Sequence, residues 1–258
     1  AFFHIYLQNK ISQKNINNIK SSKNFSKKDF FRILDNLYDI ISNLKIKIKN
    51  DNWGNYYEQK ILSDQYLDSK IKLVKDFLSI IKPKYIYDIG ANTGIFSKIS
   101  SEYCKEVISL DSDIDCTESL YLNIKQNSIT NILPLVVDLA NPTPSIGWDN
   151  NERDSFLRRM KKDTILALAV IHHLIIGNNV PLPHLANFFR KYCNNLIIEF
   201  IPINDIKVQE LLKTRKNIFT NITKDYFENV FSQFFTIIAR ETIESSSRIL
   251  YLMKNEDK

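Results

Sequence analysis

Up to about residue 82, apolar residues recur at intervals of three and four positions. In residues 29–48 they alternate with charged and polar residues and lie at Phe30, Phe31, Leu34, Leu37, Ile40, Ile41 and Leu44. This spacing puts the apolar side chains on one face of a helix, so we predict an amphipathic helix here. A similar pattern predicts a second helix over residues 66–81. It ends ahead of Pro83, because proline disfavours helical geometry in the preceding residue.

After residue 83 the pattern changes to short, continuous apolar runs that alternate with helical ones. We predict five strands, at residues 85–89, 106–111, 131–138, 164–171 and 195–201. The helices predicted between and after them lie at residues 95–104, 116–127, 152–162, 183–193, 205–216 and 223–231. Fully apolar strands that alternate with helices indicate a parallel sheet with helices on both of its faces.

The end of the chain contains two alternating runs, residues 234–242 and 247–254, joined by a short polar segment. The connection is too short for a helical crossover, so these two strands are predicted to pair antiparallel. The sequence therefore predicts an α/β fold. Its sheet has seven mostly parallel strands with an antiparallel last strand, and a helical extension precedes it.

Charge is distributed unevenly along the 258 residues. The net charge is +6, while residues 1–50 hold nine Lys and one Arg against three Asp, or +7. The remaining residues therefore carry 6 − 7 = −1. We predict a basic helical extension over residues 1–50 and one domain over residues 51–258, with its core from about residue 80. The extension is interpreted first as a solvated helical segment, and a contact with nucleic acid is the alternative.

Cysteine spacing and hydropathy limit the class of protein further. Cys104, Cys116 and Cys193 lie far apart and give neither a disulfide pattern nor a metal-binding spacing. No run reaches the roughly 18 apolar residues of a membrane span, and the first residues lack the order of a signal peptide. We therefore predict a cytoplasmic protein without a metal site or a membrane contact.

A glycine-containing turn follows the first predicted strand, in the sequence YDIGANTGIFS at residues 87–97. A dinucleotide fingerprint would need glycine where Asn92 and Ile95 stand. A phosphate-binding loop would need Lys and then Ser or Thr after Gly94, and these are missing. The remaining pattern, Asp88-x-Gly90-x-x-x-Gly94, resembles the first motif of the class I S-adenosylmethionine-dependent methyltransferases.

This resemblance covers about residues 80–258 and implies a Rossmann-like sheet that binds S-adenosyl-L-methionine at the carboxyl ends of its strands. It implies that Asp111, at the end of the second strand, binds the ribose hydroxyls. Asp138 is implied to bind the adenine amino group, and Leu139 to pack on the adenine ring. The other implied cofactor-binding residues belong to the turn and are Asp88, Gly90, Asn92 and Gly94.

Candidate residues for methyl transfer lie at the ends of the next two strands. His172 and His173 follow the fourth strand, where either could remove a proton from the acceptor or line the pocket. Glu199 ends the fifth strand and could position the acceptor or cap a loop. Arg248, in the final hairpin, is expected at the surface. The aromatic residues Trp53, Tyr56, Tyr57 and Trp148 are predicted to anchor the N-terminal helices, with an aromatic lid over the site as the alternative.

The resemblance implies methyl transfer to oxygen or nitrogen of a small-molecule or peptide-like acceptor. Stretches within residues 138–202 further resemble methyltransferase-like proteins associated with nodulation. Two alternatives stay open: an RNA methyltransferase that uses the basic extension, and a non-catalytic methyltransferase-fold domain of a larger protein. Nucleic acid is not favoured as a partner, because the pair Asn141-Pro142 comes one strand too early for the signature of nucleic-acid amino-methyltransferases.

Overall fold

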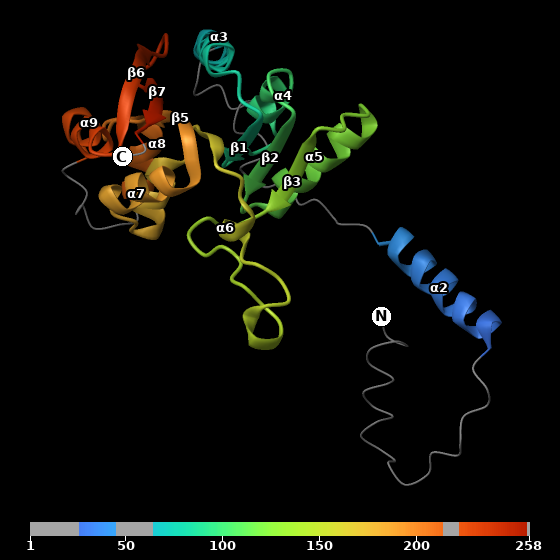
Figure 1. The fold of residues 1–258 in the computed structure, drawn as a ribbon. Coiled ribbons are helices and arrows are strands. Elements are labelled where there is room, and N and C mark those ends of the chain that lie inside the picture. Colours follow the sequence, from blue (N-terminus) through green and yellow to red (C-terminus); the bar gives the residue numbers. More distant parts are fainter. Residues whose placement is uncertain (1–25, 45–63, 214–221, 257–258) are drawn as a thin grey trace. The chain divides into compact units, whose positions relative to one another are not determined.

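The structure, a computed structural model, describes residues 26–44, 64–213 and 222–256 (Figure 1). The chain divides into two units, residues 1–47 and residues 48–258, and we describe each by itself. Three of the aromatic residues singled out in the sequence, Trp53, Tyr56 and Tyr57, lie outside the described residues. So does more than half of the predicted basic extension.

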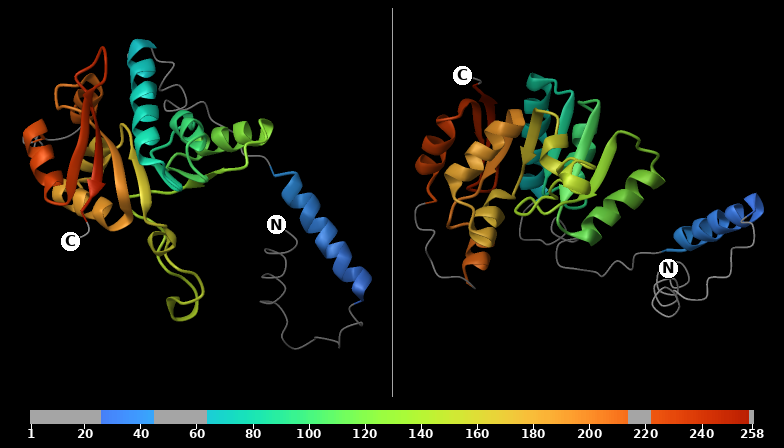
Figure 2. Two further views of the ribbon diagram at one scale, coloured as in Figure 1. Left: turned by 45° about the horizontal axis from the view of Figure 1, so that its top comes forward. Right: turned by 60° about the horizontal axis from the view of Figure 1, so that its bottom comes forward.

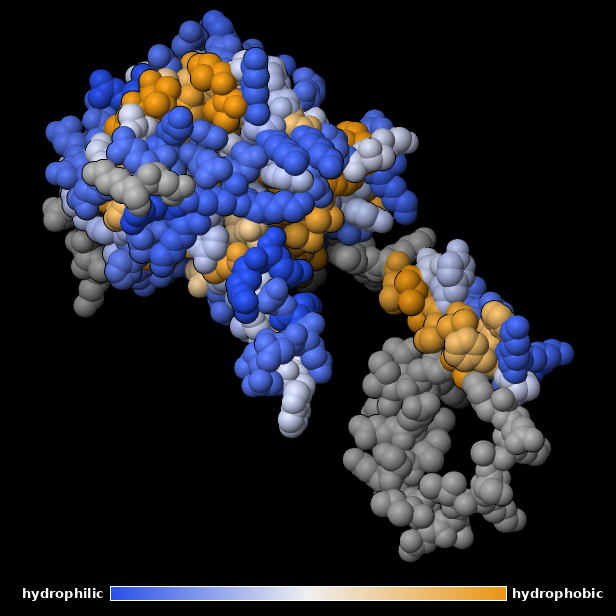
Figure 3. Space-filling model, in the orientation of Figure 1, coloured by the Kyte–Doolittle hydropathy of each residue, from blue (hydrophilic) through white to orange (hydrophobic). Residues whose placement is uncertain are grey.

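In the first unit, α2 (Lys27–Ser42) is the amphipathic helix predicted from residues 29–48, although it ends earlier. Ser26 caps its N-terminus, because Ser26 Oγ accepts a hydrogen bond from the Asp29 backbone N–H at 3.2 Å. The Asp29 carboxylate in turn accepts one from the Ser26 backbone N–H at 3.2 Å. This reciprocal capping box fixes the first residue of the helix, and apolar residues gather along one side of α2 (Figure 3).

The second unit is built on a seven-stranded sheet in the order β3-β2-β1-β4-β5-β7-β6 (Figure 1). Adjacent strands from β3 to β5 pair parallel, whereas β7 lies between β5 and β6 and is antiparallel to both. The predicted fold class is therefore confirmed, including the antiparallel last strand. The strands are β1 (Tyr85–Ile89), β2 (Glu106–Asp111), β3 (Ile132–Val136), β4 (Asp163–Ala167), β5 (Cys193–Phe200), β6 (Phe235–Thr242) and β7 (Ile249–Asn255).

Helices cover both faces of this sheet (Figure 2). Successive side chains of a strand point to opposite faces, so Ile86 joins one core and Tyr87 the other. This is why the central strands are apolar along nearly their whole length. On the Ile86 face lie α3 (Asp64–Ile81), α4 (Ile95–Ser101) and α5 (Ile114–Gln126). On the Tyr87 face lie α7 (Leu182–Tyr192), α8 (Ile206–Leu212) and α9 (Lys224–Ser232).

The helix predicted over residues 152–162 is wrong for most of its length. Only one turn forms, α6 (Phe156–Arg159), which Ser155 caps by accepting a hydrogen bond from the Arg158 backbone N–H. Ahead of it the chain makes an arm in which Ile146 pairs with Arg153 through two backbone hydrogen bonds. The arm is largely hydrophilic in Figure 3. At its tip, in the short turn η2 (Trp148–Asn150), Trp148 is 85% exposed, so it anchors no helix to the core.

The strand predicted over residues 164–171 is shorter than expected. β4 ends at Ala167, and Ala169 has a left-handed backbone with φ +52°. The chain then enters η3 (His173–Gly177), a single π-helical turn. The histidine pair therefore lies on a short helical connection beyond the strand end.

No helix among the described residues is long and apolar enough to cross a membrane. Within the same described ranges, His, Cys, Asp and Glu side chains form no cluster of three or more that could hold a metal ion.

Candidate active site

The carboxyl ends of β1 and β2 are joined by the glycine turn that follows β1. The backbone N–H groups of Gly90 and Ala91 both donate to the carbonyl oxygen of Leu110, at 2.8 and 3.0 Å. These two hydrogen bonds hold the start of the turn against the end of β2. Since β1, β2 and β3 are parallel, their carboxyl ends share one rim of the sheet.

Both glycines of the turn have left-handed backbone conformations, with φ +72° at Gly90 and +80° at Gly94. A Cβ atom at Gly94 would lie 2.3 Å from Leu120 Cδ1, so α4 packs on α5 more closely than any other residue would permit. A Cβ atom at Gly90 would lie 3.0 Å from Val170 Cγ2. Val170 belongs to the segment after β4, so the turn and the histidine segment are neighbours at the rim.

Asp111 ties the turn to the loop after β2. Its Oδ2 accepts a hydrogen bond from the Asn92 backbone N–H at 2.7 Å, and its Oδ1 accepts one from the Asp113 backbone N–H at 2.9 Å. Burial raises the pKa of Asp111, and these two hydrogen bonds oppose that shift. A carboxylate oxygen can accept more than one hydrogen bond. The structure thus brings together two residues that the sequence selected separately.

Asp88 lies beneath the turn and is 2% exposed. Its carboxylate accepts a hydrogen bond from Ser97 Oγ at 2.5 Å, and Ser97 Oγ accepts one from Ser109 Oγ at 2.7 Å. Burial raises the pKa of Asp88 to about 6, against the lowering effect of Ser97. The two serines were missed in the sequence, because a serine in an apolar run gives no signal of the acid it will contact.

Asp138 and Leu139 follow the end of β3. Asp138 is exposed, and its Oδ1 accepts a hydrogen bond from the Ala140 backbone N–H at 2.9 Å. Leu139 is partly buried and packs against the core on the Tyr87 face. Both residues therefore lie at the rim that also carries Gly90 and Asp111, with the Asp138 carboxylate open to solvent.

The two histidines after β4 differ in burial. Their ring centroids are 4.1 Å apart, and His172 is 4% exposed while His173 is partly buried. Burial lowers the pKa of His173 to about 4 and that of His172 well below its usual value. Both imidazoles are therefore neutral near pH 7. Neither nitrogen of His172 has a hydrogen-bond partner among the described residues.

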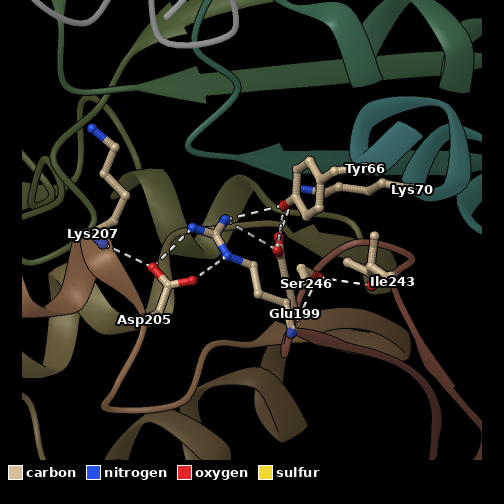
Figure 4. A network of polar contacts seen from close by, with 8 residues as sticks. Tyr66, Lys70, Glu199, Asp205, Lys207, Ile243 and Ser246 are labelled. Atoms are coloured by element: carbon tan, nitrogen blue, oxygen red, sulfur yellow. Dashed lines mark hydrogen bonds and ion pairs between the residues drawn. The ribbon is translucent and has the colours of Figure 1, made fainter. Parts of the chain in front are cut away.

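Glu199 lies in a buried polar network (Figure 4). Its Oε2 accepts from Lys70 Nζ at 2.6 Å, and its Oε1 accepts from the Tyr66 hydroxyl at 2.7 Å. Burial raises the pKa of Glu199, but Lys70 and Arg248 outweigh it, so the pKa is lowered overall. Both carboxylate oxygens of Glu199 accept hydrogen bonds, and its side chain is fully buried. Glu199 is therefore placed to fix the side chains of Tyr66 and Lys70.

Arg248 extends this network to the loop after β5. It is 1% exposed, so its predicted surface location is wrong. Its Nη1 donates to the Tyr66 hydroxyl at 3.1 Å, while Nε and Nη2 donate to the two carboxylate oxygens of Asp205 at 2.8 and 3.1 Å. Asp205 also caps α8 by accepting from the Lys207 backbone N–H at 2.9 Å (Figure 4). The network thus connects α3, β5, α8 and the final hairpin.

The sequence of α3 contains a signal that predicts part of this network. Lys70 stands four residues after Tyr66 and four before Val74, so a lysine occupies the buried face of the helix. A charged residue at such a position indicates a buried partner of opposite charge. The pattern does not say which carboxylate in the rest of the chain is that partner.

Comparison with known proteins identifies the class of fold. No family model matches the chain. The N-methyltransferase NodS of Bradyrhizobium japonicum WM9, solved in complex with S-adenosyl-L-homocysteine, superimposes with a TM-score of 0.55. The two sequences are 12% identical, and the match covers 80% of this chain and all of NodS. WbdD, a bifunctional kinase-methyltransferase, gives a TM-score of 0.52 at 17% identity, over 85% of this chain and 47% of WbdD. The chain therefore has the fold of these methyltransferases.

Sequence comparison gives a more specific resemblance than the fold does. The chain is 33% identical over 264 residues to the nodulation protein NoeA of Rhizobium meliloti (strain 1021). The match covers 99% of this chain and 55% of NoeA, so the chain spans about half the length of this relative. The predicted resemblance to methyltransferases in fold, and to a nodulation-associated protein in sequence, is therefore confirmed.

Proposed function

We propose that this chain binds S-adenosyl-L-methionine at the rim and transfers its methyl group to oxygen or nitrogen of a small-molecule or peptide-like acceptor. The observation that carries the proposal is Asp111, whose carboxylate is fixed by the Asn92 N–H of the glycine turn. An acid held in this way at the end of β2 can accept hydrogen bonds from two vicinal hydroxyls. The complex of NodS with S-adenosyl-L-homocysteine, in a protein of the same fold, supports this assignment.

The residues at the rim fit such a cofactor. Gly90 is exposed, and its lack of a Cβ atom lets a ligand lie directly along the backbone of the turn. Asp138 and Leu139 supply an exposed acceptor and an apolar surface for the adenine. Asp88, ionised above its pKa of about 6, supplies negative charge from beneath the turn, near the positive end of the cofactor. When bound, the cofactor supplies an activated methyl group, so the chain has to orient the acceptor and exclude water.

Of the two histidines, His173 has the exposure needed for direct contact with the acceptor. Its pKa of about 4 makes it a weak base, so we assign it the role of accepting a hydrogen bond from the reacting hydroxyl or amine. His172 is assigned to the wall of the pocket. Glu199 is assigned a positioning role, since its two oxygens already receive hydrogen bonds from Tyr66 and Lys70.

Calorimetric titration of the full chain with S-adenosyl-L-homocysteine tests the cofactor assignment. Asp111→Ala is expected to raise the dissociation constant at least about tenfold, because a charge-assisted hydrogen bond is lost. Asp76→Ala, which removes an exposed carboxylate from α3, serves as the matched control and should bind like the parent. Parent protein that binds no S-adenosyl-L-homocysteine while giving a folded circular dichroism spectrum would contradict the proposal.

The class of acceptor is tested separately with cell extract and methyl-labelled cofactor. Label recovered in the small-molecule or peptide fraction is the expected result. Label in RNA that depends on residues 1–50 would favour the RNA methyltransferase instead. Tight cofactor binding with no labelled product in any fraction would favour a non-catalytic domain.

A further inference from the structure

α2 carries an apolar face that no described residue of its own unit covers. None of the residues of this helix is buried. The large apolar side chains exposed on it and just after it are Phe30, Phe31, Ile33, Leu34, Tyr38, Ile41 and Leu44. Apolar residues gather along one side of α2 in Figure 3. Monomeric proteins rarely expose so many neighbouring apolar side chains without a partner, so this face is a docking surface.

The face is too broad for a single partner helix. A helix that pairs with a second copy of itself needs a narrow apolar seam, and it places charged residues beside that seam. α2 has such a seam, at Phe30, Leu34, Leu37 and Ile41. The positions beside the seam are apolar as well, at Phe31, Ile33, Tyr38 and Ile40. A two-stranded pair would leave these flanking side chains in water, whereas a broad apolar phase accepts the whole face.

The charges around α2 select the partner. Within α2 they cancel, because three basic residues stand against three aspartates, or 3 − 3 = 0. Residues 1–26 contain four Lys and residues 43–50 contain three, and neither stretch contains an acidic residue, so they carry +4 and +3. A bundle of several copies would bring these like charges together, whereas an anionic surface attracts all of them. The apolar face and the flanking charge therefore point to the same partner.

We infer that α2 lies in the interface of a membrane that contains anionic lipids, with its apolar face toward the acyl chains. Helices of this kind lie along the membrane with the apolar side about 5–10 Å deep, so they need no span. The prediction of no membrane contact rested on the lack of a span and is revised by this inference. RNA would bind the lysines but leave the apolar face in water. The inference does not depend on the proposed function.

Sedimentation of the full chain with vesicles tests the inference. The vesicles consist of phosphatidylcholine alone, or of phosphatidylcholine and phosphatidylglycerol in equal parts. We expect binding at least about tenfold tighter to the anionic vesicles at low salt, and we expect this preference to decline as salt rises. A chain that gives a folded circular dichroism spectrum and does not bind the anionic vesicles would overturn the inference.

Two variants separate the apolar face from the lysines. Leu34→Gln combined with Ile41→Gln keeps the charge and uses a good helix former. This double variant should bind anionic vesicles at least about tenfold more weakly, because apolar burial is lost. Asn36→Gln introduces the same side chain at an exposed polar position and should bind like the parent. Undiminished binding of the double variant would overturn the inference, because the lysines alone would then account for it.

A single tryptophan reports how α2 lies in the membrane. The chain has two Trp, so Phe31→Trp in a background of Trp53→Phe and Trp148→Phe leaves only one, on the apolar face. Lipids with brominated acyl chains should quench its fluorescence. Asn36→Trp in the same background is the control on the polar side and should escape quenching. Equal quenching of the two tryptophans would overturn the inference.

Two further measurements distinguish other partners. Sedimentation equilibrium without vesicles is expected to give the same oligomeric state for the parent and the double variant. A dimer that the double variant abolishes would assign the face to a second copy and overturn the inference. Single-stranded RNA is titrated in parallel. If the double variant weakens binding of RNA and not of vesicles, the apolar face belongs to an RNA partner, and the inference is overturned.

Discussion

Lys70 Nζ lies 2.6 Å from Glu199 Oε2, and neither side chain is exposed to solvent. The two residues are 129 positions apart, on α3 and β5, and each approaches a second charge or ring. Lys70 lies 4.9 Å from the centre of the Phe96 ring, which follows the glycine turn, while Glu199 lies near Arg248. This pair therefore fixes the helix that precedes the sheet to the rim on which the site is built.

The losses from removing the two members of the pair should not add up. Lys70→Met leaves the Glu199 carboxylate buried with too little positive charge, and we expect a loss of about 3–5 kcal/mol in the free energy of unfolding. Adding Glu199→Gln should make the double variant about 1–3 kcal/mol more stable than the sum of the two single losses predicts. Urea unfolding measures all three, with the exposed Lys72→Met as control. Strictly additive losses would show that the two residues are not coupled.

Asp88 should make stability depend on pH. Its pKa is about 6 in the folded chain against an ordinary value of 3.8, so the folded chain holds the proton more tightly than the unfolded chain. Stability is then lost as pH rises from about 4 to 6, by about 3 kcal/mol for this group. Asp88→Asn lacks this loss, so it should gain about that much relative to the parent between pH 3.5 and pH 7. Unfolding measured at both pH values checks this, and a constant difference would refute it.

Replacement by alanine should lower stability far more at Gly94 than at Gly177. Gly94→Ala puts a Cβ atom 2.3 Å from Leu120 Cδ1 at φ +80°, and we expect a loss of about 2–4 kcal/mol. At Gly177 a Cβ atom would meet nothing within 4 Å, so Gly177→Ala should change stability by less than about 1 kcal/mol. Thermal and urea unfolding of both variants test the comparison. Equal losses would mean that α4 and α5 do not pack as described.

Two arginines of the final hairpin provide a further contrast. Arg248→Lys loses the paired hydrogen bonds to Asp205 inside the protein, and we expect a loss of about 2 kcal/mol or more. Arg240→Lys changes an exposed contact with Glu228, which should matter much less because solvent screens it. Both are measured by urea unfolding at low salt. Similar values for the two would contradict the buried position of Arg248.

The sequence predicted the architecture well because both faces of the central strands are buried. Residues 85–89 and 106–111 read as short, mostly apolar runs and form β1 and β2 with those limits. The predicted limit of a strand was wrong where the local backbone conformation sets its end. β4 ends at Ala167, and Ala169 beyond it has a left-handed conformation. The helix expected over residues 152–162 failed because Ile146 and Arg153 pair within an arm, and neither residue signals a partner seven positions away.

The site was predicted in part for the same reason. Strand ends place Gly90, Asp111 and Asp138 on one rim, so topology alone brings them together. The partners of Glu199 were not predictable, because Tyr66, Lys70 and Arg248 come from elements far away in the sequence. Their meeting depends on how α3 and the hairpin pack.

The position of β7 between β5 and β6 has a consequence for how the protein is made. During translation β6 leaves the ribosome before the strand that must separate it from β5, so until Asn255 has emerged both strands expose unpaired backbone groups. The nascent chain therefore cannot complete its sheet from the N-terminus onward. The space between β5 and β6 stays unfilled until β7 has been synthesised, and in that interval the exposed strands are most vulnerable to pairing with another chain.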